Sequence, residues 1–203
     1  MRTLLLIHTS LQGTASLSSS LASDYVAQWQ AKHRDGRLIS RDLATNPVPH
    51  LTAERFTAFT TATDERSAEQ LAIVAFSDQL IDELQQADEI LIALPMHNFG
   101  IPSTLKAYID HVARAGITFR YTPDGAVGLL TDKRAIVFAT RGGKYLGTAL
   151  DTQTDYMKTF LAFLGIEDTQ FVYAEGTAMG DDSLNASIQS ARQQIRALDA
   201  IAA

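Results

Sequence analysis

The sequence predicts an α/β fold with a doubly wound, five-stranded parallel sheet, and three observations support this prediction. Four short runs are apolar at almost every residue, as strands buried on both faces are; they are Thr3–Ile7, Ile90–Leu94, Arg134–Ala139 and Gln170–Ala174. A fifth run, Arg37–Leu43, alternates apolar and polar residues, which is typical of an edge strand. Helical patterns separate the runs, and this alternation indicates parallel strands joined by right-handed crossovers.

Apolar residues between these runs recur at intervals of three and four, which is the spacing along one helix face. Helices are therefore expected at Leu17–Ala31, Ile73–Leu84, Leu105–Ala113, Tyr156–Leu164 and Leu184–Leu198. Gly165 is expected to end the fourth of these helices as its C-terminal cap. The segment Gly116–Thr131 interrupts the alternation, and its Pro123–Asp124–Gly125 turn predicts a hairpin.

We assign residues 1–203 to one domain, because no linker, repeat or low-complexity tract divides the chain. The strand order expected for this number of crossovers is 2-1-3-4-5. In such sheets, ligands bind beyond the carboxyl ends of the strands, at the switch point between the first and third strands. The loops that begin at His8, Pro95 and Thr140 are therefore the expected site.

Composition excludes several classes of function. The net charge of −6 argues against nucleic acid as a partner, because phosphate neutralisation needs a basic surface. The absence of cysteine excludes disulfides, thiolate metal sites and cysteine nucleophiles, and the five histidines follow no metal-binding motif. The N-terminal apolar run is too short for a secretory signal, and no segment approaches the roughly 20 apolar residues of a membrane span. We therefore expect a cytoplasmic protein without a metal and without a membrane partner.

The first loop, HTSLQGTASLSSSL, predicts an anion site. The hydroxyls of Ser10, Ser16 and Ser18 surround the expected start of a helix, whose amide groups carry partial positive charge. The loop has no lysine of the kind that triphosphate-binding loops use, so a single phosphate monoester fits it best. The alternative is that Ser16 or Ser18 serves only as an N-cap.

The two other loops predict a flat ligand with polar edges. The stretch Pro95–Pro102 holds Met96 and Phe99 together in a loop, where they suit the faces of a ring, and the Asn98 amide can meet the ring's polar atoms. Alternatively, these apolar residues cap the core. The two glycines of Thr140–Gly143 let the main chain approach a ligand closely, although an ordinary turn would have the same residues.

Together these loops resemble those of the FMN-dependent NADH:azoreductases, which belong to the flavodoxin-like quinone reductase superfamily. The matching stretches are SLQGTASLSSSLA, PMHNFGIPSTLKAYIDHVARAGITFRYT, ATRGG and FVYAEG, so that the resemblance extends from Ser10 to Gly176. It implies a flavodoxin-like homodimer with one FMN per subunit. It also implies a ping-pong reaction, in which NADH reduces the flavin and a quinone or azo compound reoxidises it.

The resemblance assigns roles to particular residues. It matches Ser10, Ser16, Leu17 and Ser18 to the phosphate loop; Met96, His97, Asn98 and Phe99 to the segment along the isoalloxazine; and Thr140, Arg141, Gly142 and Gly143 to the loop at the pyrimidine side of the ring. It also assigns Phe119, Tyr121 and Phe163 to an aromatic wall of the substrate pocket, in part from the second subunit. The segments Ala113–Thr122 and Asp155–Leu164 are the expected dimer interface. No side chain is assigned as an indispensable acid or base, since the flavin carries the chemistry.

Two other functions and one residue role remain open from the sequence, while a metal enzyme has little support because the histidines follow no metal-binding spacing. The chain could be a flavodoxin-type electron carrier, which would also bind FMN but would have no substrate of its own. It could be a serine hydrolase with Ser10 as nucleophile, although no G-x-S-x-G motif is present. His97 stands where the resembled proteins often have tyrosine, and it could donate a proton to an acceptor; a packing or hydrogen-bonding role for it is favoured.

Overall fold

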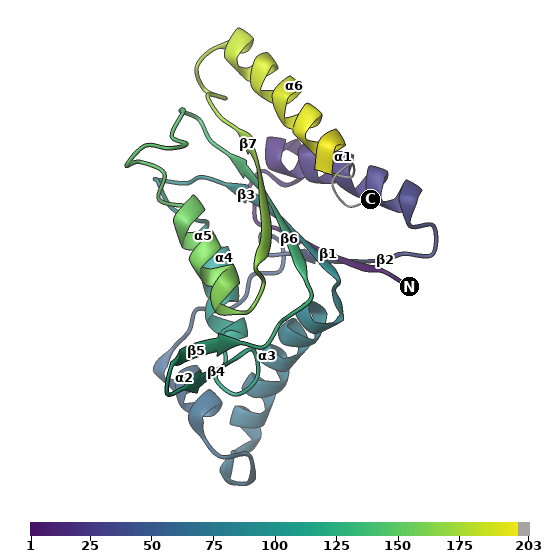
Figure 1. Cartoon of the computed structure of the whole chain (residues 1–203). Coiled ribbons are helices and arrows are strands. Elements are labelled where there is room, and N and C mark those ends of the chain that lie inside the picture. The colour runs from purple at the N-terminus through teal and green to yellow at the C-terminus, as the bar shows by residue number, and fades with distance from the viewer. Residues whose placement is uncertain (199–203) are drawn as a thin grey trace.

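Five parallel strands form the central sheet of the computed structural model, which describes residues 1–198, and their order is β2-β1-β3-β6-β7 (Figure 1). The strands are β1 (Thr3–His8), β2 (Arg37–Asp42), β3 (Glu89–Pro95), β6 (Arg134–Thr140) and β7 (Asp168–Ala174). Numbered among themselves, these strands have the predicted order 2-1-3-4-5, so the predicted fold class is confirmed. The predicted single domain was assigned to residues 1–203. Its last five residues, 199–203, lie outside the described part of the chain.

Each central strand sends alternate side chains to opposite faces of the sheet, so that two hydrophobic cores form. In β1, Leu4 and Leu6 enter one core, and Leu5 and Ile7 enter the other. These four side chains are at most 5% exposed, because helices cover both faces. Burial on both sides explains why the strands are continuous apolar runs in the sequence.

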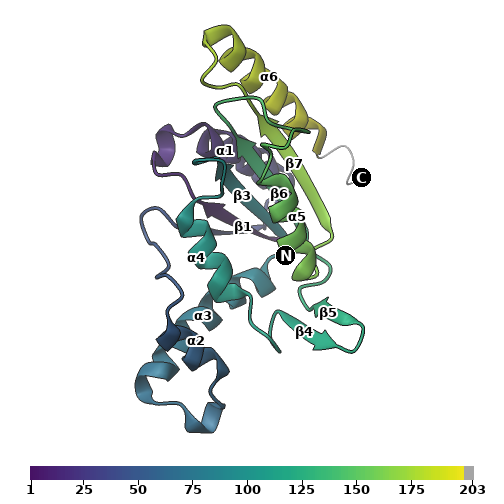
Figure 2. The same cartoon turned by 90° about the vertical axis from the view of Figure 1, so that its left-hand side faces the viewer.

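The helices divide between the two faces of the sheet (Figures 1 and 2). Apolar side chains of α1 (Leu17–Lys32) and α6 (Asp181–Leu198) belong to one core. Those of α3 (Ala68–Gln86), α4 (Ser103–Val112) and α5 (Thr154–Phe163) belong to the other. Within residues 1–198, no helix is both long enough and apolar enough to cross a membrane.

The predicted hairpin forms from β4 (Phe119–Thr122) and β5 (Gly125–Gly128), which pair antiparallel to each other and stand apart from the main sheet (Figure 2). The hairpin approaches the end of α5 so closely that a Cβ atom on Gly128 would lie 2.0 Å from the Gly165 nitrogen. Gly165 has a φ of +96°, the left-handed conformation of a helix C-cap, as predicted. The absence of side chains at these two glycines therefore allows the backbones of the hairpin and the helix end to pack against each other.

One helix was not predicted, namely α2 (Ala53–Thr60), which packs against α3. A local interaction caps its N-terminus, because the Thr52 hydroxyl accepts a hydrogen bond from the Arg55 amide over 3.3 Å. Only Ala58 in α2 is fully buried. The helix has only eight residues, and a periodic pattern is difficult to recognise in so short a segment, which explains why the sequence pattern did not reveal it.

Candidate active site

The three predicted loops meet at the carboxyl edge of the sheet. The strands β1, β3 and β6 are neighbours, and they end at His8, Pro95 and Thr140. The Met96 amide donates to the Thr140 carbonyl over 2.9 Å, which joins two of the loops directly. A cavity of about 660 Å³ opens at this edge, and its lining residues are Leu11, Met96, His97, Asn98, Ile101, Pro102, Ser103 and Thr104. This volume lies within the range of small-molecule sites.

The start of α1 holds buried hydroxyls that do not cap the helix. Ser16 occupies the N-cap position, yet its side chain makes no cap hydrogen bond. Its hydroxyl instead pairs with that of Ser18, with the two oxygens 2.8 Å apart. Ser10, Ser16 and Ser18 are all buried, and Leu17 between them is partly buried. The alternative that Ser16 or Ser18 serves only as an N-cap gains no support from Ser16, whose side chain makes no cap bond, and the helix end keeps its positive polarity for an anion.

The loop after β3 has a tight turn at its tip. His97 and Gly100 exchange two backbone hydrogen bonds of 3.1 and 2.9 Å. Between them, Asn98 and Phe99 have φ values of 49° and 63°, a conformation that costs about 1–2 kcal/mol in most residues other than glycine. Strain of this kind concentrates at functional sites.

The apolar residues of this loop have different environments. Ile101 packs against the core, as the core-capping alternative requires. Phe99 does not, because 48% of it is exposed and its ring meets Tyr145 edge-on, with centroids 5.5 Å apart. Met96 lies between these extremes, since it is partly buried and lines the cavity. The loop therefore presents apolar surface outward, where a ligand can contact it.

Gln153 is a residue that sequence reasoning missed. It is fully buried, and its amide nitrogen donates to the carbonyls of Pro95 and Gly100 over 3.2 and 2.9 Å. The Thr152 hydroxyl donates to the Phe99 carbonyl beside it. The long connection between β6 and α5 could have signalled its importance, because structureless loops of this length are usually functional.

The Arg141 side chain points inward, beneath the glycine loop that was expected to contact a ligand. Its Nη2 atom donates to Asp151 over 2.7 Å and to the Thr154 hydroxyl over 3.0 Å, and its Nη1 atom donates to Glu175 over 3.1 Å. Its guanidinium lies 5.2 Å from the centre of the Tyr173 ring. Glu175 directly follows β7, so the rule that pointed to the other three loops could also have identified it.

The Arg141 network changes the titration of Asp151. Burial by itself raises the pKa of this carboxyl. Hydrogen bonds from Arg141 and Thr154, together with the positive charge of Arg141, outweigh burial, so the pKa of Asp151 falls below its ordinary value. Asp151 is therefore an anion under ordinary conditions, and its role is to hold neighbouring groups in place.

The three aromatic residues expected in a substrate pocket do not reach this cavity within the chain. Phe119 contacts Phe163 with the two rings tilted by 45° and their centroids 4.3 Å apart, and Tyr121 meets Phe119 edge-on at 5.4 Å. This cluster lies at the β4–β5 hairpin and the C-terminal end of α5, and none of its members lines the 660 Å³ cavity.

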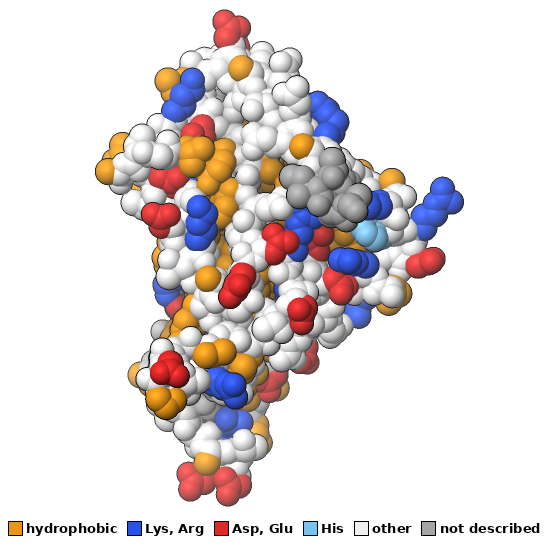
Figure 3. Space-filling model, viewed as in Figure 1, with side chains coloured by type: hydrophobic (Ala, Val, Ile, Leu, Met, Phe, Trp, Pro, Cys, Tyr) orange, Lys and Arg blue, Asp and Glu red, His pale blue; other side chains and the backbone are white. Residues whose placement is uncertain are grey.

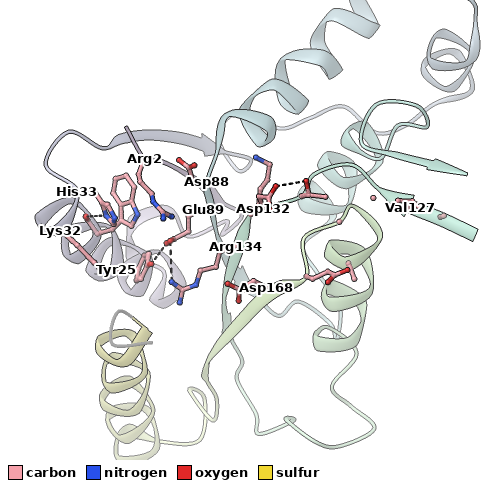
Figure 4. Close-up of a pocket in the computed structure, with 18 residues that line it drawn as sticks. Arg2, Tyr25, Lys32, His33, Asp88, Glu89, Val127, Asp132, Arg134 and Asp168 are labelled. Atoms are coloured by element: carbon pink, nitrogen blue, oxygen red, sulfur yellow. Dashed lines mark hydrogen bonds and ion pairs between the residues drawn. The ribbon is translucent and has the colours of Figure 1, made fainter. Parts of the chain in front are cut away.

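A larger cavity of about 980 Å³ lies at the opposite edge of the sheet (Figure 4). Glu89, Arg134 and Asp168, at the amino ends of three strands, line it together with other charged residues of both signs. Tyr25 donates to Glu89 there, and an Arg134 nitrogen lies 3.9 Å from the same carboxylate. Because ligands of doubly wound sheets bind at the carboxyl edge, the smaller cavity is the candidate active site.

Comparison with known proteins agrees with this geometry. A family model described as "Flavodoxin-like fold" matches residues 1–198. A protein from Cellvibrio japonicus named FMN-dependent NADH:quinone oxidoreductase is 48% identical over 199 residues, which cover 97% of this chain and 100% of that protein. A protein of the same name from Alcanivorax borkumensis is 50% identical over 194 residues, which cover 96% of this chain and 98% of that protein.

A solved structure is also similar over almost the whole chain. It is the crystal structure of an FMN-dependent NADH-azoreductase from Bacillus anthracis in complex with FMN. The two share 28% sequence identity, and the match has a TM-score of 0.84 and covers 98% of this chain and 99% of the other.

Proposed function

The chain belongs to the family of proteins with a flavodoxin-like fold, and we propose that it is an FMN-dependent oxidoreductase that uses NADH to reduce quinones and azo compounds. The observation that carries this proposal is the start of α1, where Ser16 leaves the helix amides without a side-chain cap. The names of the relatives support the same activity and do not favour an electron carrier without a substrate.

The phosphate of FMN is expected at this helix start. Ser10, Ser16, Leu17 and Ser18 would hold it, through their hydroxyls and the first amides of α1. A single phosphate group needs no lysine at such a position, because the helix end supplies partial positive charge and donors together. The buried hydroxyl pair of Ser16 and Ser18 offers donors that are already placed.

The ring system of FMN is expected against the two neighbouring loops. Met96, His97, Asn98 and Phe99 would lie along it, since three of them line the cavity and Phe99 presents exposed apolar surface beside Tyr145. The main chain of Thr140, Arg141, Gly142 and Gly143 would meet its pyrimidine side. A Cβ atom on Gly143 would lie 2.5 Å from the Tyr145 ring, so a larger residue there would force that ring to move.

The protein's part in the reaction is positioning and electrostatics. When bound, FMN supplies two-electron transfer between NADH and the acceptor. Overall, NADH gives up two electrons and one proton, and a quinone takes up two electrons and two protons, of which the second comes from water. Holding donor and acceptor together in the cavity would replace a bimolecular encounter. Such preorganisation can lower the barrier by roughly 7–11 kcal/mol. The amides of the glycine loop would stabilise negative charge at the edge of the bound ring.

We further propose a homodimer located in the cytoplasm. Exposed apolar side chains on the hairpin and around α5 support the dimer; they include Tyr121, Val127, Leu129, Leu146, Leu150 and Tyr156. Figure 3 shows hydrophobic surface beside α5 and over the hairpin. Dimerisation would bring Phe119, Tyr121 and Phe163 of one subunit toward the cavity of the other. Light scattering of the purified protein and fractionation of cells test these two points.

One experiment tests the proposed function. The visible spectrum of the purified protein is recorded with added FMN after desalting, then NADH is added without oxygen, and menadione or methyl red follows. The expected result is a retained flavin spectrum that bleaches with NADH and returns with the acceptor. A protein that retains no FMN, or that binds it but is not bleached by NADH alone, would contradict the proposal.

A further inference from the structure

We propose that Arg141 is a positioning residue, whose side chain fixes the glycine loop through Asp151 and Glu175 and does not itself contact the cofactor. This inference rests on the proposed function, because it concerns how the same site is held. It gives the Arg141 side chain a role other than contact with FMN, while the Arg141 main chain stays among the residues proposed to meet the ring. The observations that carry it are the direction, burial and partners of the Arg141 side chain.

The Arg141 side chain has no path to the cavity. It is 1% exposed, and its two terminal nitrogens are occupied by Asp151, Thr154 and Glu175. Arginine suits such a place because its rigid, planar group can serve two carboxylates at once. Without this charge, Asp151 and Glu175 would be two buried anions close to one another, which repel. The arginine therefore holds together the segments that carry these two carboxylates.

Glu175, which Arg141 holds in place, also binds the backbone that follows the two glycines. The same oxygen that accepts from Arg141 also accepts from the amides of Tyr145 and Leu146, each over 2.9 Å. Tyr145 in turn contacts Phe99, which belongs to the loop after β3. One buried ion cluster thus connects the glycine loop to the second wall of the site.

The backbone pairing of the glycine loop leaves donors free for a ligand. The carbonyls of Arg141, Gly142 and Gly143 accept from the amides of residues 176–178, over 2.8–3.2 Å. Among the hydrogen bonds of the described residues 1–198, none is donated by the amide of Gly142 or Gly143. A loop whose carbonyls are all held inward can present these two amides to a ligand. The ion cluster beneath it keeps that arrangement fixed before binding.

The test compares FMN binding by apoprotein variants, measured by the quenching of flavin fluorescence. Arg141→Met is expected to raise the Kd for FMN at least tenfold. Glu175→Gln, which keeps an oxygen for the two amides but loses the charge, is expected to raise it less. Arg141→Lys is expected to recover only part of the affinity, because a single ammonium cannot serve both carboxylates. The midpoint potential of the bound flavin should become more negative in each variant, since the loop amides stabilise negative charge.

Arg192→Met is the matched control. Arg192 also pairs with an aspartate, Asp24 at 2.8 Å, but both side chains are more than 40% exposed on the α1 and α6 surface. Its loss should leave the Kd and the potential unchanged. Circular dichroism of each apoprotein shows whether it is folded, and if Arg141→Met does not fold, Glu175→Gln and Arg141→Lys decide the question.

The outcomes separate this proposal from the proposed function. A wild-type protein that binds no FMN contradicts the proposed function. If the wild type binds FMN but the folded Arg141 and Glu175 variants retain its Kd within twofold and its potential, the positioning role is wrong. A large loss in Arg141→Lys with none in Glu175→Gln would also contradict it, because that pattern indicates direct contact between Arg141 and the flavin.

Discussion

The Gln153 side chain donates to the Gly100 carbonyl over 2.9 Å, and this bond connects the start of α5 to the turn that follows β3. The same amide nitrogen donates to Pro95, so one buried side chain holds both ends of the loop segment that lines the cavity. The two residues are 53 positions apart in the sequence. The turn, with two residues at positive φ, therefore depends on support from a distant segment.

Replacing Gln153 with leucine should destabilise the protein and weaken FMN binding. The variant leaves the buried Pro95 carbonyl without its side-chain donor, and an unpaired buried polar group costs about 1–3 kcal/mol. Urea unfolding of the apoprotein measures the stability, and flavin fluorescence measures the binding. Gln193→Leu, on the exposed face of α6, is the control and should change neither. Equal stability of Gln153→Leu and the wild type would mean that the amide bonds do not support the loop.

Alanine substitution of two N-cap serines should affect two different properties, stability for Ser67 and FMN binding for Ser16. Ser67 caps α3 with its hydroxyl and forms a complete capping box with Gln70, so Ser67→Ala should lower the free energy of unfolding by about 1 kcal/mol. Ser16 makes no such bond, and Ser16→Ala should weaken FMN binding tenfold or more, because hydrogen bonds to charged groups contribute about 1.5–3 kcal/mol.

Each serine variant is the other's control. Ser67→Ala should keep the Kd for FMN, and Ser16→Ala should keep most of the apoprotein's stability. If Ser16→Ala loses stability as Ser67→Ala does while its Kd stays at the wild-type value, then Ser16 is an ordinary cap and the anion site lies elsewhere.

The free energy of unfolding should decrease as the pH falls below about 6.5, because of His111. This side chain is fully buried between the rings of Phe59 and Phe76, and burial lowers its pKa. The charge of Arg55 on α2 acts in the same direction, while a hydrogen bond to the Ala107 carbonyl and the charge of Asp110 oppose it. Below the unfolded pKa of about 6.5, the unfolded chain binds a proton that the folded protein resists, so stability decreases as the pH falls.

The pH effect is measured by urea unfolding at pH 7.5 and 5.5. His111→Phe removes the titrating group and should flatten the curve, whose slope from one histidine is at most about 1.4 kcal/mol per pH unit. Burial also lowers the pKa of His8, so part of the slope should remain. His50→Gln, at an exposed position, should follow the wild type. A full slope in His111→Phe would assign the effect to other groups.

His97→Ala should change acceptor preference by less than about tenfold, or 1.4 kcal/mol. The side chain is exposed at the cavity, but the turn there is held by main-chain bonds between His97 and Gly100, which alanine preserves. Ratios of kcat/KM for menadione and methyl red give the preference. A hundredfold loss in reoxidation of the flavin by the acceptor, with FMN still bound, would instead make His97 a proton donor.

The sequence by itself predicted the layers, the strand order and the edge of the sheet at which the candidate site is placed. Apolar runs such as Leu4–Ile7 indicate strands buried on both faces, because a side chain's face along a strand depends only on its position in the run. Gly165 likewise marked a helix end, since a left-handed cap is a local requirement. The apolar runs and the cap follow from interactions among near neighbours in the chain, whereas the strand order was inferred from the number of crossovers.

Only the tertiary structure decided which way the polar side chains of the loops point. Arg141 turns inward to Asp151 and to Glu175, which is 34 residues away, and Gln153 reaches Pro95, 58 residues away. It also decided that the Phe119 cluster does not line the chain's own cavity. A charged or amide group in a loop takes the partners that folding brings to it, because leaving it buried and unpaired costs more than any local preference provides. Periodicity along the sequence carries no information about such partners.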